Sequence, residues 1–191
     1  MKLSDWPPPV KLLLINRQLY AEAVQWHYAR TTLFLNVCQG FSHLSFFEDM
    51  LDMIQKQPHS PLRKVRKIFV RFTWDGVFLD AVNAPNTDML DSVLQCRSQA
   101  AYNTIAAGAD NLELLTIQWM DTKCDEVAIE RRTRITAPFL TLAHRINRAG
   151  VPIKVVESEY WAKPGESFAR GHPLHTRRVE FWGIVRGGKW R

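Results

Sequence analysis

Cysteine is scarce in this chain, and its scarcity excludes a disulfide scaffold. Cys38, Cys96 and Cys124 are the only cysteines among 191 residues, and they are widely separated and odd in number. Small secreted domains that depend on disulfides carry more cysteines, usually in even numbers. We therefore expect a protein of a reducing compartment, either the cytoplasm or the nucleus.

Long apolar runs are also absent. No uninterrupted apolar stretch approaches the ~20 residues that a helix needs to cross a bilayer. The opening segment does not match a secretory signal, because Asp5 and Pro7–Pro9 interrupt any apolar core there. The sequence therefore predicts no membrane attachment.

Catalytic and metal-binding motifs are missing as well. The chain contains no CxxC, GxSxG, P-loop or GxGxxG, and isolated cysteines are more often small buried hydrophobes than nucleophiles. His172 and His175 have metal-like spacing, but a structural zinc site takes four ligands and no others lie nearby in the sequence. We expect no catalytic residue, no metal site and no cofactor. A hydrolase or transferase with an unrecognised site is the least favoured alternative.

Charge is plentiful but unevenly distributed. The formal net charge is +6, from 25 Lys and Arg against 19 Asp and Glu. Residues 131–191 hold 13 of these basic residues and only 4 of the acidic ones. The excess indicates an anionic partner near this third of the chain; a solvated basic surface that only maintains solubility is the alternative.

Apolar periodicity predicts alternating helices and strands. Expected strands cover residues 31–37, 68–74, 111–119 and 151–157. Expected helices cover residues 12–29, 46–54 and 88–105, with Gly108 ending the third, and a fourth has Pro138 in its first turn and Gly150 as its C-terminal cap.

Two of the expected strands share a pattern. Residues 70–74 and 115–119 both alternate apolar and polar positions and end in Trp, and a helix lies between them. The spacing predicts an α/β fold of repeated helix–strand units with a mainly parallel sheet and its helices on one face. A solenoid and a generic β-α-β unit both fit this spacing. We expect one domain over residues 1–157, followed by a basic, aromatic extension over 158–191 or a hairpin of the same domain.

One segment carries a family resemblance. Its matching residues are Leu13, Leu14, Asn16, Arg17, Gln18, Leu19, Tyr20, Glu22, Ala23, Tyr28 and Phe34. Together with residues 62–74 and 111–117, this pattern resembles a large group of fungal proteins related to F-box and leucine-rich-repeat-like proteins. The resemblance covers roughly residues 10–120. It implies a leucine-rich-repeat-like sheet and a protein-interaction role, and it brings no catalytic residues.

The F-box segment that often opens such proteins has no match here, so the resemblance carries no ubiquitin-ligase role. Within the motif, we expect Arg17, Gln18 and Glu22 to satisfy backbone groups of a neighbouring loop. Local packing or hydrogen bonding, of Arg17 with Tyr20 or of Glu22 with Gln18, is the alternative.

The strongest binding signal lies near the C-terminus, where basic and aromatic residues alternate. The candidate binding residues are Arg177, Arg178, Trp182, Arg186, Lys189 and Trp190. Such side chains attract phosphates and stack on unpaired bases. The preferred hypothesis is nevertheless a non-catalytic domain that binds a protein partner through a sheet edge or a helix face. The alternative is a nucleic-acid-binding module that uses this C-terminal segment.

Overall fold

A single twisted sheet organises the structure. The computed structural model describes residues 2–5, 16–38, 44–57, 60–76 and 87–163. The five strands are β1 (Lys2–Leu3), β2 (Thr32–Cys38), β3 (Lys67–Trp74), β4 (Leu114–Asp121) and β5 (Lys154–Trp161). They lie side by side in chain order. Strands β2 to β5 are all parallel, and the short β1 runs antiparallel to β2.

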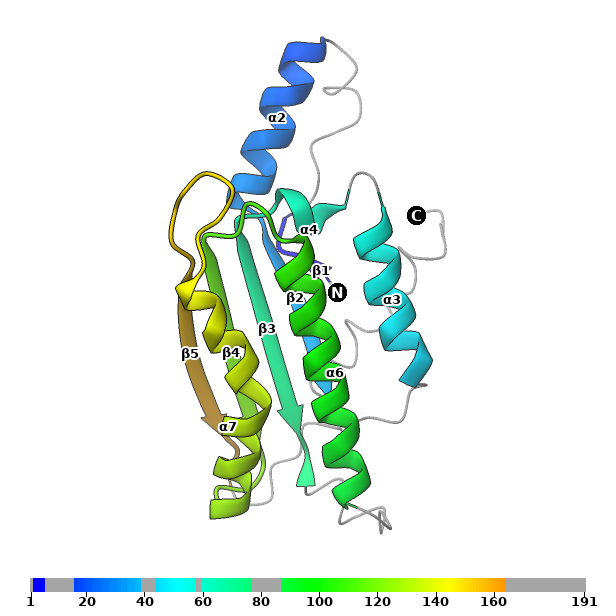
Figure 1. Cartoon of the computed structure of the whole chain (residues 1–191), viewed down its shortest axis with the longest axis vertical. Coiled ribbons are helices and arrows are strands. Elements are labelled where there is room, and N and C mark those ends of the chain that lie inside the picture. Colours follow the sequence, from blue (N-terminus) through cyan, green and yellow to red (C-terminus); the bar gives the residue numbers. More distant parts are fainter. Residues whose placement is uncertain (1, 6–15, 39–43, 58–59, 77–86, 164–191) are drawn as a thin grey trace.

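The helices that connect the parallel strands form one layer over one face of the sheet (Figure 1). This layer contains α3 (Leu44–Lys56), α6 (Thr87–Gly108) and α7 (Glu126–Leu140), with the short α4 (Pro61–Lys64) and the 3₁₀ helix η1 (Thr141–His144). A further helix, α2 (Arg17–Arg30), precedes β2 and extends beyond the end of the sheet. The α/β fold, the parallel sheet and the one-sided helix layer predicted from the sequence are confirmed.

Burial alternates along the three central strands because only one face of each is covered by helices. The buried positions are Leu33, Leu35 and Val37 in β2, Ile68, Val70, Phe72 and Trp74 in β3, and Leu115, Ile117 and Trp119 in β4. A strand turns successive side chains to opposite faces, so these residues all meet the helix layer. The alternation of apolar residues in the sequence therefore predicted these strands correctly.

The long helix α6 packs closely on its neighbours through small and apolar residues. Ser98 is buried, and its hydroxyl donates to the carbonyl of Ile135 in α7 at 2.7 Å. Gly108 ends the helix, as predicted, and a Cβ at this position would lie 2.8 Å from Cδ2 of Leu62. The absence of a side chain at Gly108 thus allows α4 to approach the end of α6.

The prediction of the fourth helix was wrong. The helix α7 ends with Pro138 in its last turn, whereas the sequence was expected to place that proline in the first turn. The start signal that this prediction overlooked is Asp125, whose carboxylate accepts the N–H of Ala128 at 2.7 Å and caps the helix. Gly150 caps no helix: it lies in a turn with a φ of 78°, a conformation that glycine adopts without strain.

The last strand both begins and ends later than the predicted residues 151–157. Strand β5 continues through Trp161, so the sheet includes the first residues of the expected extension over 158–191. Its pairing with β4 is regular up to the Asp121–Trp161 position. Residues 164–191 lie outside the described residues.

Phe139 joins three elements and offers a test of the packing. Its fully buried ring lies 5.5 Å from the ring of Phe72 in β3 and 5.8 Å from that of Tyr102 in α6, between centroids. We expect Phe139→Ala to lower the free energy of unfolding by about 3–5 kcal/mol, because truncating a buried phenylalanine leaves a cavity. Urea denaturation measures the change. The neighbouring exposed Leu140→Ala is the matched control, and equal losses in the two variants would contradict the packing described.

Candidate functional site

The binding residues proposed from the sequence cannot be placed. Arg177, Arg178, Trp182, Arg186, Lys189 and Trp190 all lie outside the described residues, and their role stays a prediction. A second basic cluster at the start of β3 lies within the described residues and consists of Arg63, Lys64, Arg66 and Lys67. There Lys64 lies over the ring of Tyr28 at 5.5 Å, and Arg66 pairs with Glu113 at 3.1 Å. Part of this cluster therefore holds α4 and β4 to their neighbours.

Helix α2 carries the motif that resembles the fungal family. Asn16 caps it by accepting the N–H of Gln18 at 2.7 Å, and Gln18 Nε2 donates to Glu22 Oε1 at 3.0 Å. For Gln18 and Glu22 the expected bonds to the backbone of a neighbouring loop were wrong, and the local pair is present instead. These polar residues stabilise their own helix rather than joining it to the sheet.

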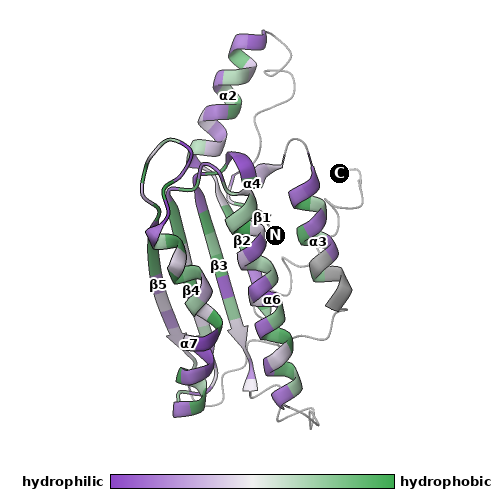
Figure 2. Ribbon diagram, in the orientation of Figure 1, coloured by the Kyte–Doolittle hydropathy of each residue, from purple (hydrophilic) through white to green (hydrophobic). Residues whose placement is uncertain are grey.

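The last turn of α2 anchors the helix to the rest of the protein. His27 is buried, its ring nitrogens lie 3.3 and 3.5 Å from the hydroxyl of the buried Thr31, and its ring packs edge-on against Tyr28. The preceding turns extend away from the sheet (Figure 1). Hydrophilic and hydrophobic residues alternate along this part of the helix (Figure 2).

Large apolar side chains remain exposed on the extending part of α2. The exposed fractions are 44% for Leu19, 47% for Tyr20 and 62% for Trp26. Leu19, Ala23 and Trp26 follow one another at intervals of four and three residues, which places them on one face of the helix. The guanidinium of Arg30 lies 5.0 Å from the centre of the Trp26 ring. We call Leu19, Ala23 and Trp26 the α2 stripe.

A second surface is the sheet face opposite the helix layer, which no described helix covers. The first three rows of paired residues on this face run across β2 to β5, and every side chain in them is at least partly exposed. We call these residues the open face: Thr32, Phe34, Asn36, Lys67, Phe69, Arg71, Leu114, Thr116, Gln118, Lys154, Val156 and Ser158. The sequence predicted both their alternation and a helix layer on the opposite face only.

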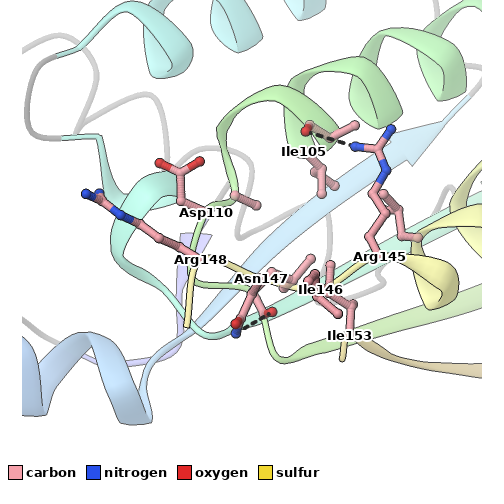
Figure 3. A pocket seen from close by; sticks show the side chains of 11 residues that line it. Ile105, Asp110, Arg145, Ile146, Asn147, Arg148 and Ile153 are labelled. Carbon is pink, nitrogen blue, oxygen red and sulfur yellow. Dashed lines mark hydrogen bonds between the residues drawn. The ribbon is translucent and has the colours of Figure 1, made fainter. Parts of the chain in front are cut away.

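A pocket of about 410 Å³ lies between the end of α6 and the segment that precedes β5 (Figure 3). Two of its polar side chains, Arg145 and Asn147, bond to the chain itself. Arg145 Nη1 donates to the carbonyl of Ala106 at 3.2 Å, and Asn147 Nδ2 donates to that of Leu112 at 3.2 Å. Asn147 Oδ1 also accepts the N–H of Ala149 and of Val151. The pocket therefore brings together no nucleophile and base, and its lining contains neither Cys nor His.

The carboxyl end of β4 holds a buried ionic cluster. Asp121 is fully buried; its Oδ1 accepts the N–H of Lys123 at 2.9 Å, and its Oδ2 lies 3.6 Å from Arg131 Nη1. Arg131 also donates to Asp91 at 3.0 Å and lies 4.0 Å from the ring centre of Trp74. The arginine thus ties α7 to α6 and to the ends of β3 and β4.

Burial controls the protonation of this aspartate. Desolvation raises the pKa of Asp121 to about 6, opposed by the Lys123 N–H and the Arg131 charge and supported by the negative charge of Asp125.

The described residues contain neither a metal-binding cluster nor a membrane-spanning helix. These residues contain no group of three or more His, Cys, Asp and Glu side chains placed to hold a metal ion. No described helix is both long enough and apolar enough to cross a membrane. His172 and His175 lie outside the described residues.

No family model, curated protein or solved structure matches this chain. The resemblance to fungal F-box-like and leucine-rich-repeat-like proteins therefore stays a prediction. Function has to be argued from the surfaces described above.

The raised pKa of Asp121 predicts a pH-dependent stability. The folded-state pKa of about 6 exceeds the ordinary value of 3.8. The contribution of the Asp121 carboxyl to the free energy of unfolding is therefore most favourable below pH 3.8 and is lost as the pH rises through about 6. We expect Asp121→Asn to gain stability relative to the native chain between pH 4 and 7, because the amide stays neutral. Denaturant unfolding at several pH values measures this difference. The exposed Asp110→Asn is the control, and a pH-independent difference for Asp121→Asn would contradict the assignment.

Proposed function

We propose that this chain is a non-catalytic protein-interaction domain of the fungal F-box-like type, and that α2 contacts the protein partner. The observation that carries the proposal is the α2 stripe on a helix anchored by its last turn. Exposed free thiols at Cys96 and Cys124 fit a reducing compartment, so we place the interaction in the cytoplasm or the nucleus.

The helix α2 gains little from the rest of the fold. It has 14 residues, and His27 is the one residue of the helix that is buried. Isolated helices of this length are marginal in water, and helices in proteins are usually stabilised by burying an apolar face. A partner that covers the α2 stripe would supply that missing burial.

The spacing of the α2 stripe indicates how a partner would bind. Apolar side chains at intervals of four and three residues are the anchors of a helix that lies in an apolar groove. Trp and Arg are enriched among the residues that dominate binding energy, and Trp26 and Arg30 lie together on this part of the helix. The partner should therefore offer an apolar groove for Trp26 with a carboxylate beside it for Arg30.

The alternative is a nucleic-acid-binding module that uses Arg177, Arg178, Trp182, Arg186, Lys189 and Trp190. The local excess of basic residues supports it. It predicts binding through the C-terminal segment that falls steeply with salt.

Affinity purification with quantitative mass spectrometry tests the role of α2. The full-length protein and its Trp26→Ala variant are each incubated with a nuclease-treated extract of fungal cells. We expect at least one protein to be recovered at stoichiometric level by the native chain and depleted roughly 30-fold by Trp26→Ala. Truncating a central tryptophan anchor typically costs about 2 kcal/mol or more.

Ile146→Ala is the matched control, because Ile146 is 71% exposed and lies far from α2 in the chain. It should recover the same protein as the native chain. Identical recovery by all three proteins would reject α2 as the contact. Recovery of stoichiometric proteins only from an extract without nuclease treatment would favour the nucleic-acid alternative instead.

A further inference from the structure

The open face is unusual for a parallel sheet. Parallel sheets normally have both faces covered, and their strands are apolar throughout. Here the covered face is apolar, whereas the open face carries hydroxyl, amide and basic side chains around a small aromatic centre. This composition is typical of a surface that meets a polar partner rather than a second helix layer.

Two phenylalanines form that centre. Phe34 on β2 and Phe69 on β3 are paired in the register, and their ring centroids lie 5.2 Å apart at an interplanar angle of 43°. Both side chains are partly exposed. Adjacent aromatic rings on neighbouring strands offer flat apolar faces on which unpaired bases stack, whatever their sequence.

Arg71 lies next to this pair in an ordered position. Its guanidinium is 5.4 Å from the ring centre of Phe69, and its Nε donates to Gln118 Oε1 at 2.7 Å. Arginine recognises phosphate through several N–H groups in one plane and also stacks on bases. The hydrogen bond to Gln118 fixes the side chain across the face, which lowers the entropic cost of using it in binding.

The charge of the open face has one sign. Lys67, Arg71 and Lys154 are basic, and no residue of the open face is acidic. The acidic residues of the same strands face the helix layer: Glu157 and Glu159 are paired with buried residues of β4 and form ion pairs with Arg132 of α7. This segregation of charge suits a polyanionic ligand.

We infer that the open face binds single-stranded nucleic acid, with bases stacked on Phe34 and Phe69 and the phosphate backbone held by Arg71, Lys67 and Lys154. Asn36 and Gln118 are paired with Arg71 on either side of it, next to the aromatic pair, and supply amide groups for base edges. This site is separate from the α2 stripe and from the C-terminal basic residues, so it does not depend on the protein-interaction role proposed above.

Fluorescence anisotropy with the full-length protein tests the inference. The probes are fluorescein-labelled oligo(dT) and oligo(U) of about 20 nucleotides, with a duplex of the same length for comparison. We expect the single strands to bind more tightly than the duplex, because only unpaired bases can stack. Phe69→Leu should weaken binding about tenfold, since it keeps an apolar side chain but removes the aromatic face.

Charge is tested with a matched pair of arginine variants. Arg71→Gln should weaken binding and lower the slope of log affinity against log salt by about 1. The control variant Arg148→Gln changes an exposed arginine in the turn before β5. It should leave the affinity and the salt slope unchanged. Thermal unfolding of each variant shows whether it is folded, and Arg71→Lys, which keeps the charge, should retain most of the salt dependence.

Three outcomes would overturn the inference. The first is the absence of measurable binding to either single strand by the native chain, which is the result expected if this face is covered by another segment or by a second copy. The second is equal binding by the native chain and folded Phe69→Leu and Arg71→Gln variants. The third is loss of binding only when Arg177, Arg178 and Arg186 are replaced by Gln, which would assign binding to the C-terminal segment.

Discussion

The order of the parallel strands is the constraint on which the rest of the structure depends. Strands β2 to β5 follow one another across the sheet in chain order, so each crossover advances in the same direction. Crossovers between parallel strands are right-handed, and repeated steps in one direction therefore place every connecting helix on the same face. The result is one apolar core between the sheet and the helices α3, α6 and α7, which lie on one face of the sheet (Figure 1). The open face lies on the other side.

The same order affects where ligands can bind. Open α/β sheets usually bind ligands in a crevice where the strand order reverses, beyond the carboxyl ends of the strands. No such reversal occurs among β2 to β5. The carboxyl ends of β3 and β4 are instead closed by Arg131, which packs on Trp74 and faces the buried Asp121. The candidate binding sites of this chain are therefore surfaces, the α2 stripe and the open face, rather than a crevice.

Local pattern and topology contributed differently to what the sequence could predict. Alternating apolar residues such as Ile68, Val70 and Phe72 identified a strand, because a strand with one buried face needs an apolar residue at every second position. The fourth helix was misplaced because Pro138 fits either end of a helix on composition, and the cap at Asp125 decides between them. The aromatic pair of the open face was not predicted, because Phe34 and Phe69 are far apart in the sequence and become neighbours only through the register of β2 and β3. The residues favoured for binding, such as Arg177 and Trp182, lie outside the described residues.

The two surfaces differ in what they need from a partner. The α2 stripe exposes apolar area on a helix of marginal length, so its binding would be driven by burial and would depend little on salt. The open face is already ordered by strand pairing on both sides of Phe69 and by the Arg71–Gln118 hydrogen bond, so a ligand there meets fixed groups whose attraction is largely electrostatic. The two proposed interactions have different driving forces. Salt should therefore weaken binding at the open face and leave binding at the α2 stripe nearly unchanged. The α2 stripe and the open face share no residue, so the two proposed ligands would not compete for the same side chains.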